Sequence, residues 1–436
     1  MTTYPPGPPP LRRRDLLRKV RSIRDLLSDP IAYVGGRFSE FGDLYHVDEG
    51  GGSHLYITRA PDRIREVLVE RAGDYQKRGG ANDRLVPVLG NGLLTADGEA
   101  WKEQRRLLQP RFHQRAIAGY AATMVGHTRA VAWGDGETVD VSDEMMRLTL
   151  RIVCQALFDH DVQDQADAIG ATMDALRRAS EQSLLPDWIP TPGRFRARRA
   201  VAGIDALIAR LVAERREEGL RDDLLSMLLD VGLDPTLVRD NLVTLFLAGH
   251  ETTSHALSWT WWLLAKHPEA EARLHAELDE VLGDRDPTVD DLPSLPWTDA
   301  VIQESMRLFP PAYAIPRVAR VDTELGGYPV TAGSQVVSWL WHCHRGPWFE
   351  APDAFRPERF LQPTFPKHAY LPFGAGTRMC IGAGFARMEL RLVLATLARR
   401  YRLRATPGQT VRPLPRVTLS PEGGLPLRVE RRGPIS

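Results

Sequence analysis

Apolar residues recur at helical spacing through most of the chain between residues 99 and about 308, and proline and glycine mark the breaks. The longest stretch without a break follows Asp234-Pro235, which reads as an N-cap with proline at the first helical position. No further proline occurs before Pro268. The pattern therefore predicts one helix of about 30 residues and about 45 Å, long enough to cross the molecule.

Short alternating runs, which are typical of strands, lie toward both ends of the chain. Residues 45–58 predict a hairpin, and further runs occur at 318–330, 335–340 and 401–429. Runs that are distant in sequence can pair in one sheet, so we expect a mostly α fold with a small β region (α+β). We expect a single domain over residues 1–436, preceded by a flexible proline-rich arm at residues 1–10.

Residues 11–27 predict an amphipathic basic helix, with Leu16, Val20, Ile23 and Leu27 on one stripe. The simplest interpretation is a first helix that packs on the body and keeps a solvated basic face. Contact with a membrane surface is the alternative, and the short stripe disfavours it.

Charge and cysteine content narrow the class of protein. Basic and acidic side chains number 56 each, so no overall field attracts nucleic acid. Three cysteines at wide spacing, without a CxxC pair, argue against a disulfide framework and for a reducing compartment. We see no apolar leader, and no apolar run approaches the ~18 residues of a membrane span. The expectation is a soluble cytoplasmic protein.

The strongest candidate chemistry lies in Phe373-Gly-Ala-Gly-Thr-Arg-Met-Cys380-Ile-Gly382, directly before a helix-like run. Gly374 and Gly376 permit a loop that approaches a flat ligand closely. Cys380 precedes a helix start, where unpaired N–H groups favour a thiolate, and Arg378 can reach an anionic group such as a propionate. A thiolate on haem iron favours O–O cleavage. The alternatives are an inert buried thiol or a Rossmann loop, for which the third glycine is missing.

The centre of the long helix, Ala248-Gly-His-Glu-Thr-Thr253, is poor helix sequence. A glycine there costs about 1 kcal/mol, and the two threonines are β-branched. Such a local conflict often marks a functional site, and a threonine can bond a backbone carbonyl and open the helix. A solvated glutamate beside a back-bonded threonine is the alternative without function.

The segment 373–382 matches every fixed position of FxxGxRxCxG, and the chain resembles the cytochrome P-450 superfamily of haem-thiolate monooxygenases, in its soluble bacterial type. The resemblance runs from about Gly90 to the C-terminus. Glu304-Ser-Met-Arg307 resembles the family's ExxR helix, and 355–360 resembles the arginine segment that follows it. Residues 248–253 resemble the oxygen-activation motif, and Trp101-Lys-Glu-Gln-Arg105 resembles the WxxxR helix.

The resemblance implies a role for each matched residue. Haem b (iron protoporphyrin IX) would take Cys380 as its axial metal ligand, and Glu251 and Thr252 would be catalytic, delivering protons. Gly249 would make room for dioxygen. The residues implied to bind the cofactor are Trp101, Arg105, Ala248, Gly249, Arg317, Phe373, Gly374, Arg378, Cys380 and Gly382. A buried structural network would join Glu304, Arg307 and Arg359.

His344, His342 and His255 take none of these roles. His344-Arg345 departs from the family pattern, because Gly346 replaces the usual acid, and we interpret it as structural. His342 and His255 are interpreted as ordinary packed or surface histidines.

The resemblance also implies the reaction. One oxygen atom from dioxygen would enter a C–H or C=C bond of an apolar small molecule of secondary metabolism: a terpenoid, fatty acyl, steroid, carotenoid or macrolide. The residues expected to border the substrate pocket are 78–88, 184–189, 245–248, Thr253 and 312–315. Electrons would come from a ferredoxin or flavodoxin with its reductase, docked on a basic patch of Arg106, Arg111, Arg115 and Arg387, and the protein would be a monomer.

Four alternatives remain at this point. A peroxygenase driven by hydrogen peroxide and a haem isomerase or dehydratase are disfavoured, because the acid–alcohol pair is intact. A non-catalytic haem protein that binds gases comes from another class. Without haem, Cys380 would suggest a thiol hydrolase, but no well-placed histidine and asparagine accompany it.

Overall fold

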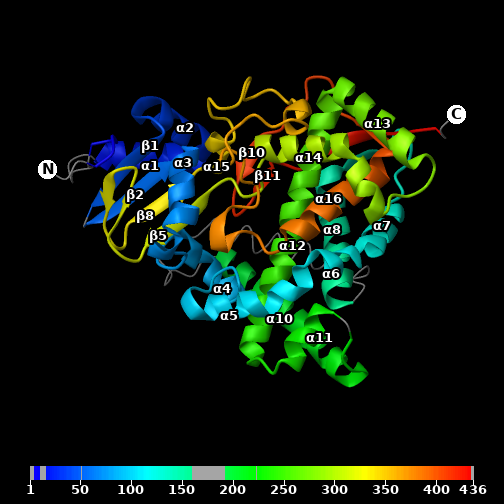
Figure 1. The fold of residues 1–436 in the computed structure, drawn as a ribbon, viewed down its shortest axis with the longest axis horizontal. Coiled ribbons are helices and arrows are strands. Elements are labelled where there is room, and N and C mark those ends of the chain that lie inside the picture. The colour runs from blue at the N-terminus through cyan, green and yellow to red at the C-terminus, as the bar shows by residue number, and fades with distance from the viewer. Residues whose placement is uncertain (1–3, 10–15, 51, 160–191, 222, 434–436) are drawn as a thin grey trace. The chain divides into compact units, whose positions relative to one another are not determined.

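Helix α12 (Pro235–Lys266) is the longest helix in the computed structural model, which describes residues 4–9, 16–50, 52–159, 192–221 and 223–433 (Figure 1). The Asp234 side chain caps it by accepting a hydrogen bond from the Thr236 N–H at 2.8 Å. The helix has 32 residues, and Trp259 and Trp261 are fully buried in it. The predicted long helix is confirmed, and its apolar character on most sides explains why it lies in the interior.

Backbone contacts divide the chain into two compact units, and each is described by itself. The first unit comprises residues 1–83, 307–354 and 363–380. The second comprises residues 84–306, 355–362 and 381–436. The single domain expected for residues 1–436 stays a prediction.

The first unit is built on a five-stranded sheet with the order β1-β2-β8-β5-β3 (Figure 1). The predicted hairpin is present, and its second strand pairs in parallel with β8, so that Tyr56 lies opposite Val336. The elements of this unit are α1 (Leu16–Ser28), α2 (Pro30–Phe41), β1 (Leu44–Gly50), β2 (Ser53–Thr58), α3 (Pro61–Arg65), β3 (Tyr75–Gln76), β5 (Ile315–Ala319), β6 (Thr323–Leu325), β7 (Tyr328–Val330), β8 (Gln335–Ser338) and α15 (Leu340–Cys343).

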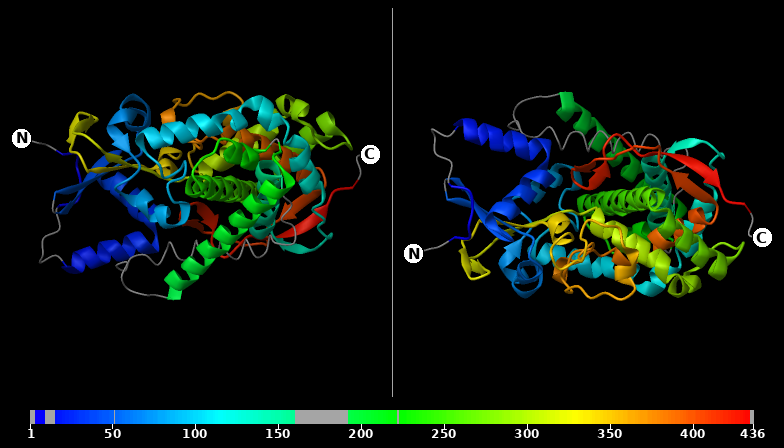
Figure 2. Two further views of the ribbon diagram at one scale, coloured as in Figure 1. Left: turned by 90° about the horizontal axis from the view of Figure 1, so that it is seen from below. Right: turned by 90° about the horizontal axis from the view of Figure 1, so that it is seen from above.

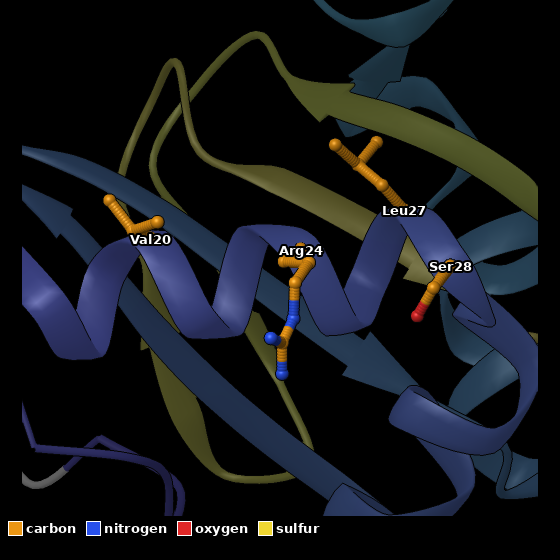
Figure 3. Close-up of a pocket in the computed structure, with 4 residues that line it drawn as sticks. All are labelled: Val20, Arg24, Leu27 and Ser28. Carbon is orange, nitrogen blue, oxygen red and sulfur yellow. The ribbon is translucent and has the colours of Figure 1, made fainter.

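Helix α1 departs from the interpretation of a first helix whose apolar stripe packs on the body. Val20 and Leu27 of that stripe are 56% and 54% exposed. Together with Arg24 and Ser28 they line an open surface hollow (Figure 3), which contains none of the predicted site residues. The amphipathic pattern of α1 is therefore only partly used for packing among its described side chains.

The second unit is mainly helical, and α8 (Val141–Phe158) and α16 (Ala383–Ala398) pack on α12, which runs through its middle (Figure 2). Helix α14 (Pro296–Leu308) begins in this unit. Its other helices are α4 (Val86–Leu89), α5 (Gly98–Leu108), α6 (Gln114–Ala118), α7 (Ala121–Arg129), α10 (Pro192–Glu218), α11 (Leu224–Asp230) and α13 (Pro268–Leu282).

The expectation that distant runs pair in one sheet holds for the hairpin with β8 and β5. It does not hold for the C-terminal strands, which lie in other sheets. β12 (Pro426–Arg431) pairs with β9 (Tyr401–Arg404) and β4 (Thr138–Asp140) in a separate sheet of the second unit. Alternate residues of β12, Leu427 and Val429, are buried. A shift of one residue against β9 or β4 would expose them, so this pattern fixes the register of the strand. β10 (Pro413–Pro415) and β11 (Leu419–Pro421) form a further pair.

Within the described part of the chain, none of the helices combines the length and the apolar character that crossing a bilayer requires.

Candidate active site

The Cys380 loop is shaped by its backbone. The Cys380 N–H donates to the Phe373 carbonyl at 3.0 Å, and the Met379 N–H donates to the Gly376 carbonyl at 3.1 Å. Gly374 and Gly376 adopt φ angles of +71° and +70°, which glycine alone adopts without strain. A Cβ on Gly376 would lie 1.9 Å from the carbonyl oxygen of Leu68. Sterics therefore require glycine at 376, and the loop has one strongly determined shape.

Cys380 is the accessible thiol of the chain. Its side chain is exposed, whereas Cys154 and Cys343 are buried. Burial raises the pKa of the Cys343 thiol, which lies against the carbonyls of His368 and Ala369. Cys343 is thus an inert packed thiol, and Cys380 is the cysteine that an external ligand can reach. It precedes α16 by only a few residues, with Gly382 at the N-cap position.

The centre of α12 presents a small accessible face within a buried helix. Ala248 is exposed and Thr252 is half-buried, and residues four apart share one side of a helix. The Thr252 hydroxyl donates to the Ala248 carbonyl at 2.9 Å, so the back-bonding that the sequence suggested is present. The side chain of His250 points elsewhere, because its ring nitrogen Nδ1 donates to the Phe246 carbonyl at 2.7 Å. Burial lowers the pKa of His250.

Gly249 has a packing reason that the sequence does not reveal. A Cβ at this position would lie 3.0 Å from Cγ2 of Val153 on α8. The absence of a side chain therefore lets α8 approach α12 closely. The role beside dioxygen stays a proposal.

Trp101 and Arg105 lie one turn apart on α5, and buried polar contacts hold this helix. The buried Gln104 amide donates to the Asn91 carbonyl at 3.0 Å, and the Asn91 N–H donates to Asp240 at 2.7 Å. Asp240 belongs to the first turns of α12, so the preceding loop ties α5 to that helix. Arg105 itself donates to the Gln109 side chain at 2.9 Å. Composition alone did not reveal these anchors.

Glu304 of α14 is fully buried and holds an arginine segment of the second unit. Its Oε1 accepts a hydrogen bond from the Arg359 Nε at 3.0 Å and another from the Arg356 N–H at 2.8 Å. A buried carboxylate requires such compensation, because removing one partner leaves an unpaired charge. This geometry distinguishes the pair from the many solvated pairs on helix surfaces.

Arg307, the other charged residue of the motif, is also fully buried. Its guanidinium donates to the carbonyls of His344 (2.7 Å), Pro352 (2.6 Å) and Ala354 (3.0 Å), all within the first unit. It therefore organises a loop through backbone acceptors. Carbonyl partners carry no sequence signal, and the motif could not predict them.

The segment after β8 explains the departure from the family pattern at Gly346. A Cβ on Gly346 would lie 2.1 Å from the ring of Trp348, whose indole N–H donates to the Cys343 carbonyl. The indole thus occupies the space that a side chain at 346 would need. His344 is buried, and its Nε2 accepts the Leu371 N–H at 2.9 Å, which agrees with a structural role.

Arg317 and the residues expected to border a substrate pocket lie on different elements and have different surroundings. Arg317 lies on β5 and is buried, with its guanidinium donating to the Pro316 carbonyl at 2.9 Å. Of the residues expected to border a pocket, 184–189 lie outside the described residues. Phe246 packs against Phe158 of α8, and the buried Thr253 hydroxyl donates to the Gly249 carbonyl at 3.1 Å.

Two residues with site contacts were missed by sequence reasoning. Thr418 donates a hydrogen bond to Glu251 at 2.5 Å, and no pattern links positions so far apart. Glu389 of α16 is fully buried. Burial raises the pKa of its carboxyl well above the usual range, and a smaller effect of the Thr253 side chain lowers it. A lone acid in the apolar run of α16 was the available signal for Glu389.

The donor set of the first unit fits a haem-thiolate. An exposed cysteine, two glycines at positive φ and an arginine two residues before the cysteine stand on one short loop. A flat macrocycle needs the close backbone approach that these glycines give, and its propionates need a cation. The residues present therefore fit the group that the resemblance implies.

Comparison with known proteins agrees with this geometry. The family model described as Cytochrome P-450 matches residues 5–426. A cyclooctatin synthase of Streptomyces melanosporofaciens is 37% identical over 96% of this chain and 93% of its own length. A cyclooctat-9-en-7-ol 5-monooxygenase of the same organism is 39% identical, covering 85% of this chain and 84% of its own.

A pentalenene oxygenase of Streptomyces avermitilis is 34% identical over 94% of both chains. Among solved structures, the haem domain of a cytochrome P-450 aligns with a TM-score of 0.82 at 29% identity, covering 90% of each chain.

Proposed function

Because the chain belongs to the cytochrome P-450 family, as the match over residues 5–426 shows, we propose that it is a haem b monooxygenase of cyclic terpenoids, with Cys380 as the iron ligand. The broader activity is established by the relatives: the protein is an oxidoreductase that incorporates an oxygen atom of dioxygen into an apolar substrate. The terpenoid class, the form of the haem and each residue's role are the proposal.

The exposed Cys380 on its glycine-shaped loop is the observation that carries the proposal. Arg378 of the same loop would hold a propionate, as would Trp101 and Arg105 of α5 and Arg317 of β5. Once bound, the haem supplies oxygen activation, and a thiolate ligand favours O–O cleavage. The remaining chemistry falls to side chains that bind substrate and move protons.

Glu251 and Thr252 would move the protons. Glu251 is half-buried on α12 and is held by a hydrogen bond, so its carboxylate has a defined position. The Thr252 hydroxyl donates to a carbonyl of its own helix, and a small rotation frees it for a water or an oxygen atom. A positioned acid of this kind contributes about 10²- to 10⁴-fold to a rate.

Support for a terpenoid substrate comes from the relatives. Their names refer to cyclooctatin, cyclooctat-9-en-7-ol and pentalenene, which are terpenoids, and the first and third cover more than nine-tenths of this chain. Ala248, the exposed residue at the centre of α12, is small and apolar. An apolar polycyclic molecule suits such a surface.

The test of ligation is the absorbance difference spectrum of the reduced protein with carbon monoxide. A strongly red-shifted Soret band in the wild type, lost in Cys380→Ser, is expected. An unshifted band in the wild type would contradict thiolate ligation. For the substrate class, pentalenene is the probe: we expect it to shift the Soret band of the ferric protein and to yield an oxygenated product. Turnover of fatty acids alone would contradict the terpenoid proposal.

For electron supply, we propose a ferredoxin or flavodoxin with its reductase. Arg106, Arg115 and Arg387 are exposed on α5, α6 and α16, and Arg111 is half-buried beside them in sequence. The start of α16 approaches α6 so closely that a Cβ on Gly384 would lie 3.0 Å from Ile117, which brings Arg115 and Arg387 onto neighbouring elements. Such a basic patch favours an acidic partner.

Arg115→Glu tests the docking proposal. Ferredoxin-driven turnover should fall several-fold and lose much of its salt dependence, while the carbon monoxide spectrum stays unchanged. Unchanged turnover would exclude this patch. Turnover supported by hydrogen peroxide at the same rate as by ferredoxin would instead favour a peroxygenase.

A further inference from the structure

Three side chains of the second unit form one hydrogen-bonded chain that the sequence motifs do not contain. The Thr418 hydroxyl donates to Oε1 of Glu251 at 2.5 Å. The same hydroxyl oxygen lies 3.1 Å from Nδ1 of His255. His255 is 1% exposed and Thr418 is 8% exposed, so bulk water competes little for either bond.

Helix α12 and the segment 418–419, which carry these three side chains, are held together by further contacts. Glu251, His255 and Trp259 stand four residues apart along α12, and all three contact the segment 418–419. The indole N–H of Trp259 donates to the Leu419 carbonyl at 3.0 Å. One stripe of α12 therefore fixes the start of β11, and with it the position of the Thr418 hydroxyl relative to Glu251.

Counting protons gives the chain a direction. A threonine hydroxyl carries one proton, and at 2.5 Å from a carboxylate oxygen that proton lies on the Thr418–Glu251 bond. The Thr418 oxygen must then accept from His255, which requires the proton of that imidazole to be on Nδ1. His255 thereby prevents the hydroxyl from turning away from Glu251.

We propose that Thr418 is a positioning residue for the acid Glu251, and that His255 acts through Thr418 by fixing the direction of its hydroxyl. The bond to Oε1 holds the carboxylate in one orientation and leaves Oε2 for proton exchange. This assignment rests on the proposed role of Glu251 in proton delivery. The sequence interpretation of His255 as an ordinary packed histidine is refined accordingly.

The alternative is a purely structural tie between α12 and β11. Both interpretations predict some loss of stability when the tie is cut. They differ in how electrons are used, because a misoriented acid slows proton delivery and diverts reduced oxygen to hydrogen peroxide. The fraction of the electrons supplied by the reductase that is recovered as hydrogen peroxide is therefore the informative quantity.

The experiment compares Thr418→Val with Thr418→Ser in the haem-loaded protein, with pentalenene as the probe and a surrogate ferredoxin and reductase as the electron source. Valine keeps the shape and removes the hydroxyl, whereas serine keeps the hydroxyl. We expect Thr418→Val to raise the peroxide-to-product ratio about tenfold, which corresponds to the loss of one hydrogen bond to a charged group. Thr418→Ser should remain close to wild type, and His255→Phe should fall between them.

An equal peroxide fraction in Thr418→Val and wild type would overturn the proposal. A change of equal size in Thr418→Ser would also overturn it, because the hydroxyl would then not be the cause. A change in melting temperature without a change in the peroxide fraction would assign the contact to structure alone.

A second readout does not depend on turnover. In the reduced carbon monoxide complex, which is diamagnetic, ¹⁵N NMR of the imidazoles reports which ring nitrogen of His255 carries the proton. We expect Nδ1–H in the wild type and a shifted Nδ1 resonance in Thr418→Val. A wild-type His255 protonated only on Nε2 would overturn the proposed direction of the chain.

Failure of this inference and failure of the proposed function are distinguishable. A missing red-shifted Soret band would reject thiolate ligation whatever the histidine signals show. A normal band, with product from pentalenene and an unaffected peroxide fraction in Thr418→Val, would keep the function and reject Thr418 as a positioning residue.

Discussion

The Cys380 loop and the centre of α12 both carry proposed reactive residues, but the chain holds them in opposite ways. In the loop, two glycines at positive φ and backbone hydrogen bonds set the shape, and the thiol is exposed. In α12 the backbone is an ordinary helix, and the reactive side chains are held by Thr418 and by the Ala248 carbonyl.

The difference matches the demands of the two tasks. A metal ligand needs one fixed position, which a backbone without alternative conformations provides. A group that moves protons needs to reorient slightly, which a side chain on a rigid helix can do. We therefore expect changes of backbone shape to be most harmful to stability in the loop, and changes of side-chain chemistry on α12 to act mainly on turnover.

The largest expected effect is that of Cys380→Ser, which leaves the loop backbone intact and removes the thiolate. The red-shifted band of the reduced carbon monoxide complex should be lost, and product from pentalenene should fall below detection. Cys343→Ser is the matched control, because that thiol is buried, and its spectrum should match wild type. A red-shifted band that survives in Cys380→Ser would show that Cys380 is not the thiolate ligand.

The next largest effect separates two glycines of the same loop. Gly376→Ala would place a Cβ 1.9 Å from the Leu68 carbonyl at a φ of +70°, so we expect the free energy of unfolding to fall by at least about 3 kcal/mol. Gly374→Ala has nearly the same φ, but its nearest neighbour is Ile315 at 3.6 Å, and about 1 kcal/mol is expected. Urea denaturation measures both.

Equal losses in the two variants would mean that strain, and not the Leu68 carbonyl, requires glycine in this loop.

On α12 the expected effect is on turnover and not on stability. Glu251→Gln keeps the shape and the hydrogen bond to Thr418 but cannot exchange a proton as an acid. Turnover of pentalenene should fall about 10²-fold, with the carbon monoxide spectrum and the melting temperature unchanged. An unchanged turnover number would remove Glu251 from the proton path. A lost Soret band would show instead that α12 shapes the haem site through this side chain.

The smallest expected effect concerns Gly249. Alanine gains about 1 kcal/mol of helix propensity but meets Val153 at 3.0 Å, so Gly249→Ala alone should change the free energy of unfolding by less than about 1 kcal/mol. In a Val153→Ala background, which opens the contact, the same change should stabilise by about 1 kcal/mol.

Turnover of the double variant, compared with that of Val153→Ala alone, decides what Gly249 is for. Retained turnover would make close helix packing its whole role. Lost turnover would support the proposed space for dioxygen.

Much of this molecule could be predicted from local sequence. The limits of α12 followed from Asp234, Pro235 and Pro268, because caps and prolines act within a few residues. The hairpin at residues 44–58 followed from alternation in the same way. The motif around Cys380 identified the loop, because its glycines encode backbone angles directly.

What remained hidden depends on partners that are remote in sequence. The packing of α1 was overestimated, because an amphipathic stripe shows only that a helix can be buried, and Val20 and Leu27 are exposed. The carbonyl acceptors of Arg307 leave no trace in residue identity.

By itself, then, the sequence determined the family and the long helix and pointed to Cys380 and to the acid–alcohol pair as candidates, since motif spacing and helical periodicity are local properties. Only the tertiary structure decided that Gly376 is pressed against the Leu68 carbonyl, that Gly249 admits α8, and that Thr418 joins Glu251 to His255. Each of these is a contact between segments far apart in the chain. Such contacts are selected by packing and by the need to satisfy buried polar groups, which no local pattern records.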